Sequence, residues 1–468
     1  MMAEVARKLA EYATGLDYEA LPSAVVEKAK QLVLDLVGIA LCASATADST
    51  PALRDAVLAL GGAGEASLIG EERTLSPAWA ALLNGSYAHS LDADDTHREG
   101  SVHPGAAIVP TLLALAEQHR IGGRRLLAAM VAGYDVTCKL AMAVDPGSHY
   151  GRGFHPTATC GIFGATAAGA NLLGLSAEVL GDAFGINLSQ SAGSLEFLAD
   201  GAWTKRLHPG LAAHGAILAL ELAGRGFRGP QDPFEGPRGF FHAYSDAARP
   251  RLAVEGLGER FEILATAVKP YPCCRYAHGP LDLVIRLAAE NRIRPGEVES
   301  VRVGMSDVAA DIVGRPIERK RAPENVVDGQ FSLPFLAAVA LTRGRLGWTD
   351  YELVGDPSLR PLMQKVEVVA SEEANRAFPE RWLAEVEIRA RGRVFADRTW
   401  VVKGEPEAPL SWEELEAKFD GLAAARIADA GRRRHLVEVV RGLDRVSDLR
   451  QLGRLLRRET AAGVGRAP

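Results

Sequence analysis

The sequence has few aromatic residues and no excess of positive charge. Phe, Trp and Tyr make up 6% of its 468 residues, and 59 acidic against 53 basic residues give a net charge of −6. Proteins that bind nucleic acids usually carry a basic excess, and those that bind single strands use aromatic side chains to stack on bases. We therefore predict that this protein binds no nucleic acid.

Cysteine is also scarce. The chain has five cysteines and no C-x-x-C pair, which disfavours a disulfide framework, a zinc ribbon and a three-cysteine iron–sulfur site. Residues 1–13 contain charges and lack the apolar centre of a signal peptide. The most apolar stretch, residues 156–175, is rich in Ala, Gly and Thr, which is typical of a buried helix rather than a membrane span. We predict a protein of the reducing cytoplasm that does not enter a membrane.

Several motifs of cofactor and metal chemistry are absent. The sequence contains neither a phosphate-binding G-x-x-x-x-G-K-[ST] loop nor a G-x-S-x-G nucleophile turn. No two histidines have a metal-ligand spacing on a helix; His97 with His103 and His208 with His214, for example, are six residues apart. Asp92–Asp95 matches the D-x-D-D of one class of terpene cyclase, but few aromatic residues are available to shelter a carbocation. We predict no cofactor and no metal.

The apolar pattern of the first 265 residues is helical almost throughout. In residues 23–43, apolar side chains recur at helical spacing on one face: Val26, Ala29, Leu32, Val33, Leu36 and Ile39. Similar patterns cover residues 51–60, 76–90, 105–119, 124–144, 159–173, 177–190 and 210–225. This part of the chain is predicted to form a bundle of helices.

After residue 265 the pattern changes. Residues 301–305, 365–369, 384–389 and 394–402 are predicted strands, the last two joined by a turn at Arg391-Gly392, and residues 279–292 and 331–343 are predicted helices. Helical periodicity returns over residues 411–458. We predict a mostly α fold, in which an all-helical domain formed by both chain ends, 1–265 and 404–468, carries an inserted α+β domain, 266–403.

Four polar segments concentrate the groups that bind acids and move protons: 92–103, 151–157, 200–210 and 269–278. Each alone has an ordinary structural explanation, respectively a charged turn, a helix cap, a basic surface loop and a rigid linker. Together they supply Asp92, His103, His155, Lys205, His208, Lys269, Arg275 and His278. Because cations hold carboxylates and histidines titrate near neutral pH, this set suits a small polycarboxylic acid as substrate.

The same segments, with Leu34–Gly38 and Phe331–Pro334, closely resemble the MmgE/PrpD family over nearly the whole chain. This family includes iron–sulfur-independent 2-methylcitrate dehydratases, cis-aconitate decarboxylases and iminodisuccinate epimerases. The resemblance implies a homodimer without a cofactor. It also implies that the α+β domain acts as a lid on the helical domain and that the active site lies between the two.

The resemblance also implies roles for individual residues. By motif, the predicted catalytic residues are Asp92, His103, His155, Lys205 and His278, and the predicted substrate-binding residues are Thr96, His208, Lys269 and Arg275. Three features depart from the family pattern. The segment between Thr96 and His103 is one residue longer than in the decarboxylases, Asp135 stands where the family has Glu, and residues 329–332 do not resemble the 2-methylcitrate dehydratase branch.

All three family reactions develop negative charge on a carbon next to a carboxylate, which fixed cations stabilise. Lys205 and His103 are the predicted cations, while His155 and His278 are predicted to exchange protons on opposite faces of the substrate. The leading hypothesis is a cofactor-free lyase, either a dehydratase or a decarboxylase, for a small di- or tricarboxylic acid. The closest alternative is an isomerase of the epimerase type. A further alternative is a non-catalytic paralogue that only binds acids.

Overall fold

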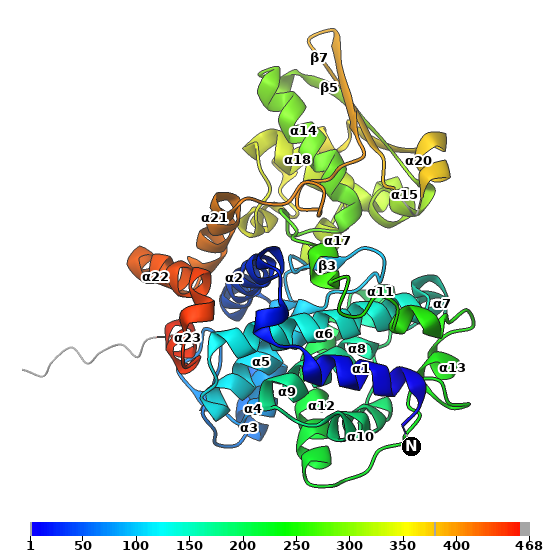
Figure 1. The fold of residues 1–468 in the computed structure, drawn as a ribbon. Coiled ribbons are helices and arrows are strands. Elements are labelled where there is room, and N and C mark those ends of the chain that lie inside the picture. Colours follow the sequence, from blue (N-terminus) through cyan, green and yellow to red (C-terminus); the bar gives the residue numbers. More distant parts are fainter. Residues whose placement is uncertain (1, 379–380, 459–468) are drawn as a thin grey trace, which may run out of the picture. The chain divides into compact units, whose positions relative to one another are not determined.

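The computed structural model describes residues 2–378 and 381–458, which divide into two compact units (Figure 1). The helical unit comprises residues 2–90, 94–267 and 411–458. The α+β unit comprises residues 91–93 and the described part of 268–410. A mostly helical fold with a small sheet-containing region confirms the predicted fold class.

The helical unit is built around long buried helices. Its helices are α1 (Glu4–Gly15), α2 (Ser23–Thr46), α3 (Thr50–Leu60), α4 (Pro77–Ala88), α5 (Gly105–His119), α6 (Gly123–Ala143), α7 (Pro146–Gly151), α8 (Pro156–Thr159), α9 (Gly161–Leu173), α10 (Ala177–Leu188), α11 (Phe197–Asp200), α12 (Thr204–Gly224), α13 (Phe240–Tyr244), α21 (Trp412–Ala423), α22 (Ala430–Arg441) and α23 (Arg450–Leu456). α6 packs along α9, and α12 packs against both α4 and α9. Two short strand pairs complete the unit: β1 (Ala66–Ser67) with β2 (Thr74–Leu75), and β3 (Thr96–His97) with β4 (Thr266–Ala267).

Small residues allow the central helices to approach closely. A Cβ at Gly164 of α9 would lie 1.7 Å from the Thr137 side chain and 2.6 Å from the Gly133 carbonyl oxygen of α6. Only glycine therefore fits at this crossing. Two helices, α2 and α6, are apolar enough to cross a membrane, but 83% and 100% of their apolar windows are buried inside the protein. This burial identifies them as core helices.

The two ends of the described chain meet within the helical unit. α21 packs against α2, where Gly38 leaves room for the ring of Phe419: a Cβ at Gly38 would lie 2.9 Å from a carbon of that ring. Beside this contact, the Lys418 ammonium lies 2.6 Å from a carboxylate oxygen of Asp35, whose side chain is 1% exposed. A buried ion pair thus ties the C-terminal helices to the second helix of the chain.

The α+β unit contains a four-stranded sheet in the order β6-β5-β7-β8. Its strands are β5 (Val298–Met305), β6 (Val366–Ala370), β7 (Ala384–Ala390) and β8 (Arg393–Thr399). β5 pairs in parallel with β6, with Val301 opposite Val366, whereas β7 is antiparallel to both β5 and β8. Arg391 and Gly392, which have positive φ angles, form the β7–β8 turn.

Helices and short turns complete the α+β unit. They include α14 (His278–Glu290), α15 (Asp307–Val313), α16 (Ile317–Lys320), α17 (Val326–Gln330), α18 (Leu333–Arg343), α19 (Arg360–Met363) and α20 (Glu372–Ala377). α14 packs on β7, on β8 and on α18. Buried residues of α14, α18 and the sheet form one apolar core.

One helix boundary differs from the sequence-based expectation in a way that matters for the site. Residues 200–210 were expected to form a loop before a helix at 210, but α12 begins at Thr204 and includes Pro209. Lys205 and His208 are therefore held on the first turns of a helix. The proline is tolerated because it lies near the helix start, where its missing N–H removes only the hydrogen bond to the Lys205 carbonyl.

Candidate active site

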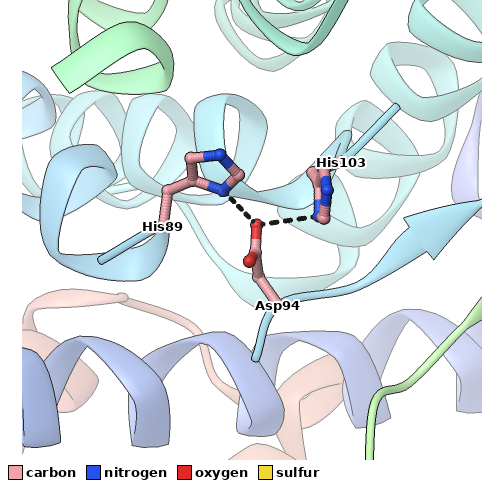
Figure 2. Close-up of side chains that lie close together, drawn as sticks. All are labelled: His89, Asp94 and His103. Atoms are coloured by element: carbon pink, nitrogen blue, oxygen red, sulfur yellow. Dashed lines mark hydrogen bonds and ion pairs between the residues drawn. The ribbon is translucent and has the colours of Figure 1, made fainter. Parts of the chain in front are cut away.

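Two histidines of the helical unit, His89 and His103, contact the carboxylate of Asp94 (Figure 2). His89 directly follows α4, Asp94 lies in the turn that comes next, and His103 precedes α5. Oδ2 of Asp94 is 2.7 Å from Nδ1 of His89 and 3.3 Å from Nδ1 of His103. Because His89 and Asp94 are fully buried, this carboxylate holds the two imidazoles in fixed orientations.

The two neighbouring carboxyl groups, Asp94 and Asp95, differ in charge. Burial alone would raise the pKa of Asp94, but the charges and hydrogen bonds of His89 and His103 outweigh it and hold that pKa well below its usual range. Burial and the adjacent Asp94 charge raise the pKa of Asp95 to about 8, although Tyr134 donates a hydrogen bond to it over 2.8 Å. At neutral pH, Asp94 is therefore ionised and Asp95 protonated.

A second histidine pair lies beside the first cluster. His155 immediately precedes α8, and its Nδ1 is 3.0 Å from Nδ1 of His208 on α12. The ring centre of His155 is 5.7 Å from that of His89. Burial lowers the pKa of both residues, and for His155 the charges of His89, Lys205, His208 and His103 lower it further. His155 is consequently neutral in the empty site.

The remaining predicted residues of the helical unit are Lys205 and Thr96. Lys205 lies in the first turn of α12, and its charge lowers the pKa of both His155 and His208. Thr96 lies on β3, two residues beyond Asp94, and is buried. The helical unit thus gathers His103, His155, Lys205 and His208 around two previously unassigned groups, His89 and Asp94.

In the α+β unit, Asp92 and Lys269 form a buried pair. The Lys269 ammonium lies 3.2 Å from Oδ1 of Asp92 and donates a hydrogen bond to the Asp92 carbonyl over 2.8 Å. Asp92 has a positive φ of 53°, which Asp tolerates better than most residues. Gln330 donates a hydrogen bond over 2.8 Å to the adjacent Leu91 carbonyl. These contacts fix the backbone turn that carries Asp92.

His278 and Arg275 complete the set of predicted residues. His278 begins α14, and its Nε2 donates to the Cys273 carbonyl over 3.2 Å. Burial, followed by the charge of Lys269, lowers the pKa of His278 to about 3. Arg275 forms an ion pair with Glu405 and stacks over Trp382. The predicted acid-binding guanidinium therefore already has a carboxylate partner in the protein.

His89 and Asp94 are not among the residues predicted from the sequence. His89 lies fourteen residues from His103 on a different element, so no helical spacing connects them. A signal was available, because three acids within four residues are costly to bury without cations close by. His89, five residues before Asp94, and His97, three residues after it, were the histidines nearest in the sequence.

The His89–Asp94–His103 cluster also raises the question of a metal. One ligand atom from each residue lies within 4.8 Å of the others, and two histidines with one carboxylate can bind a transition metal. Both Nδ1 atoms, however, already face one oxygen of Asp94, His89 in a hydrogen bond and His103 in an ion pair. We expect full activity after exhaustive chelation, measured as turnover with and without EDTA. Loss of activity that one defined divalent metal restores would instead identify the three residues as ligands.

Cys273 and Cys274 are buried in the core of the α+β unit. Burial raises the pKa of the Cys273 thiol well above its usual range, which disfavours a reactive thiolate. We expect Cys274→Ser to keep most of the activity in a steady-state assay. A loss of about 10³-fold, comparable with the removal of a principal electrostatic group, would show that this thiol takes part in the chemistry.

The helical unit thus holds a cluster of histidines around a buried carboxylate. Residues 7–253 match the MmgE/PrpD N-terminal domain, and residues 271–442 match the MmgE/PrpD C-terminal domain. The chain therefore belongs to the MmgE/PrpD family, as its motifs predicted.

Curated relatives match the chain over almost its full length. It is 26% identical to a cis-aconitate decarboxylase of Aspergillus terreus over 474 residues, which cover 97% of this chain and 96% of that protein. It is also 26% identical to the human cis-aconitate decarboxylase, with 98% and 95% covered. The mouse cis-aconitate decarboxylase is 25% identical, with 98% and 94% covered. These relatives are enzymes named for acting on a small carboxylic acid.

Proposed function

We propose that the protein is a cofactor-free lyase that decarboxylates a small polycarboxylic acid of the cis-aconitate type. The observation that carries this proposal is the contact of His103 with the buried Asp94 carboxylate, beside His155, which lies next to His89 and within reach of the charge of Lys205. These side chains supply the cations and the proton donor that the reaction needs without a cofactor. The full-length similarity to cis-aconitate decarboxylases supports decarboxylation over the dehydration and epimerisation known in the family.

In the proposed reaction, the bond between carbon and the departing carboxylate breaks and carbon dioxide leaves. The electron pair stays on the substrate and spreads into a neighbouring carboxylate, where Lys205 and His103 stabilise it. A proton then adds to carbon. His155 is the proposed donor, and Asp94 orients His103 from behind. Thr96, Lys269 and Arg275 are proposed to hold substrate carboxylates, with Asp92 positioning Lys269 and with His278 as a second proton-exchanging group.

The binding of the substrate prepares His155 for this role. In the empty site, burial and neighbouring cations keep the imidazole neutral, and a neutral imidazole is a poor acid. A polycarboxylate beside Lys205 offsets those cations and raises the pKa of His155. The imidazole therefore takes up a proton when the substrate arrives.

The proposed function is tested by incubating the protein with cis-aconitate, citrate and 2-methylcitrate in D2O. We expect release of carbon dioxide from a cis-aconitate-like acid and one deuterium on carbon in the product, measured by mass spectrometry and NMR. Water loss from citrate or 2-methylcitrate would instead assign a dehydratase. Deuterium exchange with inversion and no loss of carbon would assign an epimerase, and binding without turnover a non-catalytic paralogue.

Two expectations from the family resemblance belong to the same proposal, namely a cytoplasmic location and a homodimer. The mass of the chain is 49.8 kDa. Light scattering of the purified protein is expected to give twice that mass, and a monomeric mass would remove the homodimer from the proposal.

A further inference from the structure

A cavity in the helical unit reaches one member of the histidine pair. It has a volume of about 660 Å³ and is lined on one side by His208, Leu211 and His214 of α12. The exposed acids Glu196 and Asp200 also line it. Carboxylates together with histidines that burial keeps neutral do not suit a polycarboxylic acid, so this cavity is not the proposed substrate site. It is large enough to hold many water molecules.

His208 lies between this cavity and His155. Its side chain lines the cavity, and its Nδ1 contacts Nδ1 of His155, which is 3% exposed. Gly193 allows the approach: its carbonyl accepts the His155 backbone N–H over 2.9 Å, and a Cβ there would lie 2.7 Å from Ala158 and 3.5 Å from Nδ1 of His208. The ring of Phe197 packs edge-on against both imidazoles.

We propose that His208 is a proton relay, which protonates His155 from water in this cavity once in each turnover, when substrate is bound. The inference rests on the proposed function, because a decarboxylation consumes one proton at carbon while a dehydration consumes none overall. A buried donor that gives up a proton in every cycle needs a route by which to regain one. The contact with His208 supplies that route, and it gives His208 a role other than the predicted one in substrate binding.

The transfer balances in three proton movements. Because two Nδ1 atoms share one hydrogen bond, one of them carries the proton and the other accepts it. A proton from cavity water first adds to Nε2 of His208. The proton on Nδ1 of His208 then crosses to Nδ1 of His155, whose Nε2 proton passes to the substrate carbon. One proton enters from water, one new C–H bond forms, and no group is oxidised or reduced. Each imidazole ends as its other tautomer, and a half-turn of both rings about the Cβ–Cγ bond, followed by proton exchange with water, restores the proton arrangement before the next turnover.

The surrounding charges give the relay a direction. His208 and His155 both face the charges of Lys205 and His89, and His155 also faces His103. These charges oppose a proton on either imidazole while the site is empty. A bound polycarboxylate offsets them, so protons move inward when substrate is present. Glu196 and Asp200 favour protons at the cavity side.

The test is His208→Asn, because an asparagine amide can hydrogen-bond to His155 but cannot carry a proton through itself. In a rapid-mixing assay we expect every turnover, the first included, to be slowed by ~10²-fold, because His155 stays neutral until a proton reaches it through His208. Added imidazole, which fits the cavity, is expected to restore turnover in proportion to its concentration. His208→Gln provides a second variant, and circular dichroism checks the fold of each.

His214→Gln is the matched control. His214 lines the same cavity but packs edge-on against Trp79, 5.0 Å away between ring centres. We expect wild-type turnover that does not depend on imidazole. Equal imidazole dependence in His214→Gln, or slow turnover in His208→Asn without any response to imidazole, would overturn the relay.

A measurement without substrate separates this inference from the proposed function. In protein labelled with ¹⁵N-histidine, the shared Nδ1–H proton is expected as a downfield NMR signal that His208→Asn removes and His214→Gln keeps. Absence of that signal in the wild type overturns the relay whatever the reaction is. Presence of the signal in a protein that releases no carbon dioxide from any tested acid would overturn the proposed function alone.

Discussion

Asp94→Asn is expected to lower kcat by about 10²–10⁴-fold, the range for loss of positioned acid–base catalysis. The variant removes the negative charge that His89 and His103 share, while the side chain keeps its size. An asparagine amide also presents N–H groups where the carboxylate accepts a hydrogen bond from His89 and pairs with His103, so one imidazole must turn or change tautomer. Steady-state kinetics on the true substrate measure the loss.

Asp95→Asn is the matched control for this prediction. Asp95 is equally buried and adjacent in sequence, but its pKa of about 8 leaves it protonated at neutral pH. Asparagine has nearly the shape and the same charge as a protonated aspartic acid. We expect less than about a tenfold change in kcat, well below the range for loss of acid–base catalysis. Equal losses in the two variants would show that Asp94 acts through the fold rather than through its charge.

Lys205→Ala is expected to lower kcat by about 10²–10³-fold, as for the loss of one preorganised electrostatic donor. KM should change much less, because the charge that Lys205 meets grows mainly in the transition state. The structure strengthens this expectation, since Lys205 is fixed on the first turn of α12 and its charge acts on both His155 and His208. An ordinary surface cation would contribute under about 1 kcal/mol.

A suitable control for Lys205 lies on the same polypeptide segment. Arg225 directly follows α12, is exposed and pairs with Glu221, so Arg225→Ala should leave kcat unchanged. Arg206 is a poorer control, because it is buried and holds Asp48 and Ser49. Near-wild-type kcat in a folded Lys205→Ala protein would remove Lys205 from the mechanism. The histidines alone would then have to account for catalysis.

Local sequence patterns predicted most of the helices because apolar periodicity is a short-range property. Residues 105–119 were expected to form a helix, and α5 spans Gly105–His119. The same reasoning missed the first turns of α12, since Pro209 and Gly210 indicate a helix start when read alone. Only the packing of α12 against α4 and α9 makes the earlier start favourable.

The sequence suggested members of the candidate site but not the contacts between them. The concentration of histidines and cations in four polar segments singled out His103, His155 and Lys205. Whether Asp94 or Asp95 carries the charge depends on what lies around each carboxylate, which is set by tertiary structure: histidines around one and Tyr134 beside the other. The contact between His155 and His208 joins α8 to α12 across fifty-three residues, so no local pattern reveals it.

The pairing of Asp35 with Lys418 bears on how the protein is made. During synthesis, α2 leaves the ribosome long before α21, and the whole inserted unit is translated between them. At about 5–20 residues per second, the stretch from Asp35 to Lys418 takes roughly 20–80 seconds. Until then, Asp35 lacks its ion pair with Lys418 and the groove at Gly38 lacks Phe419. The nascent helical bundle therefore has an open flank during translation, when a holding chaperone is expected to bind it.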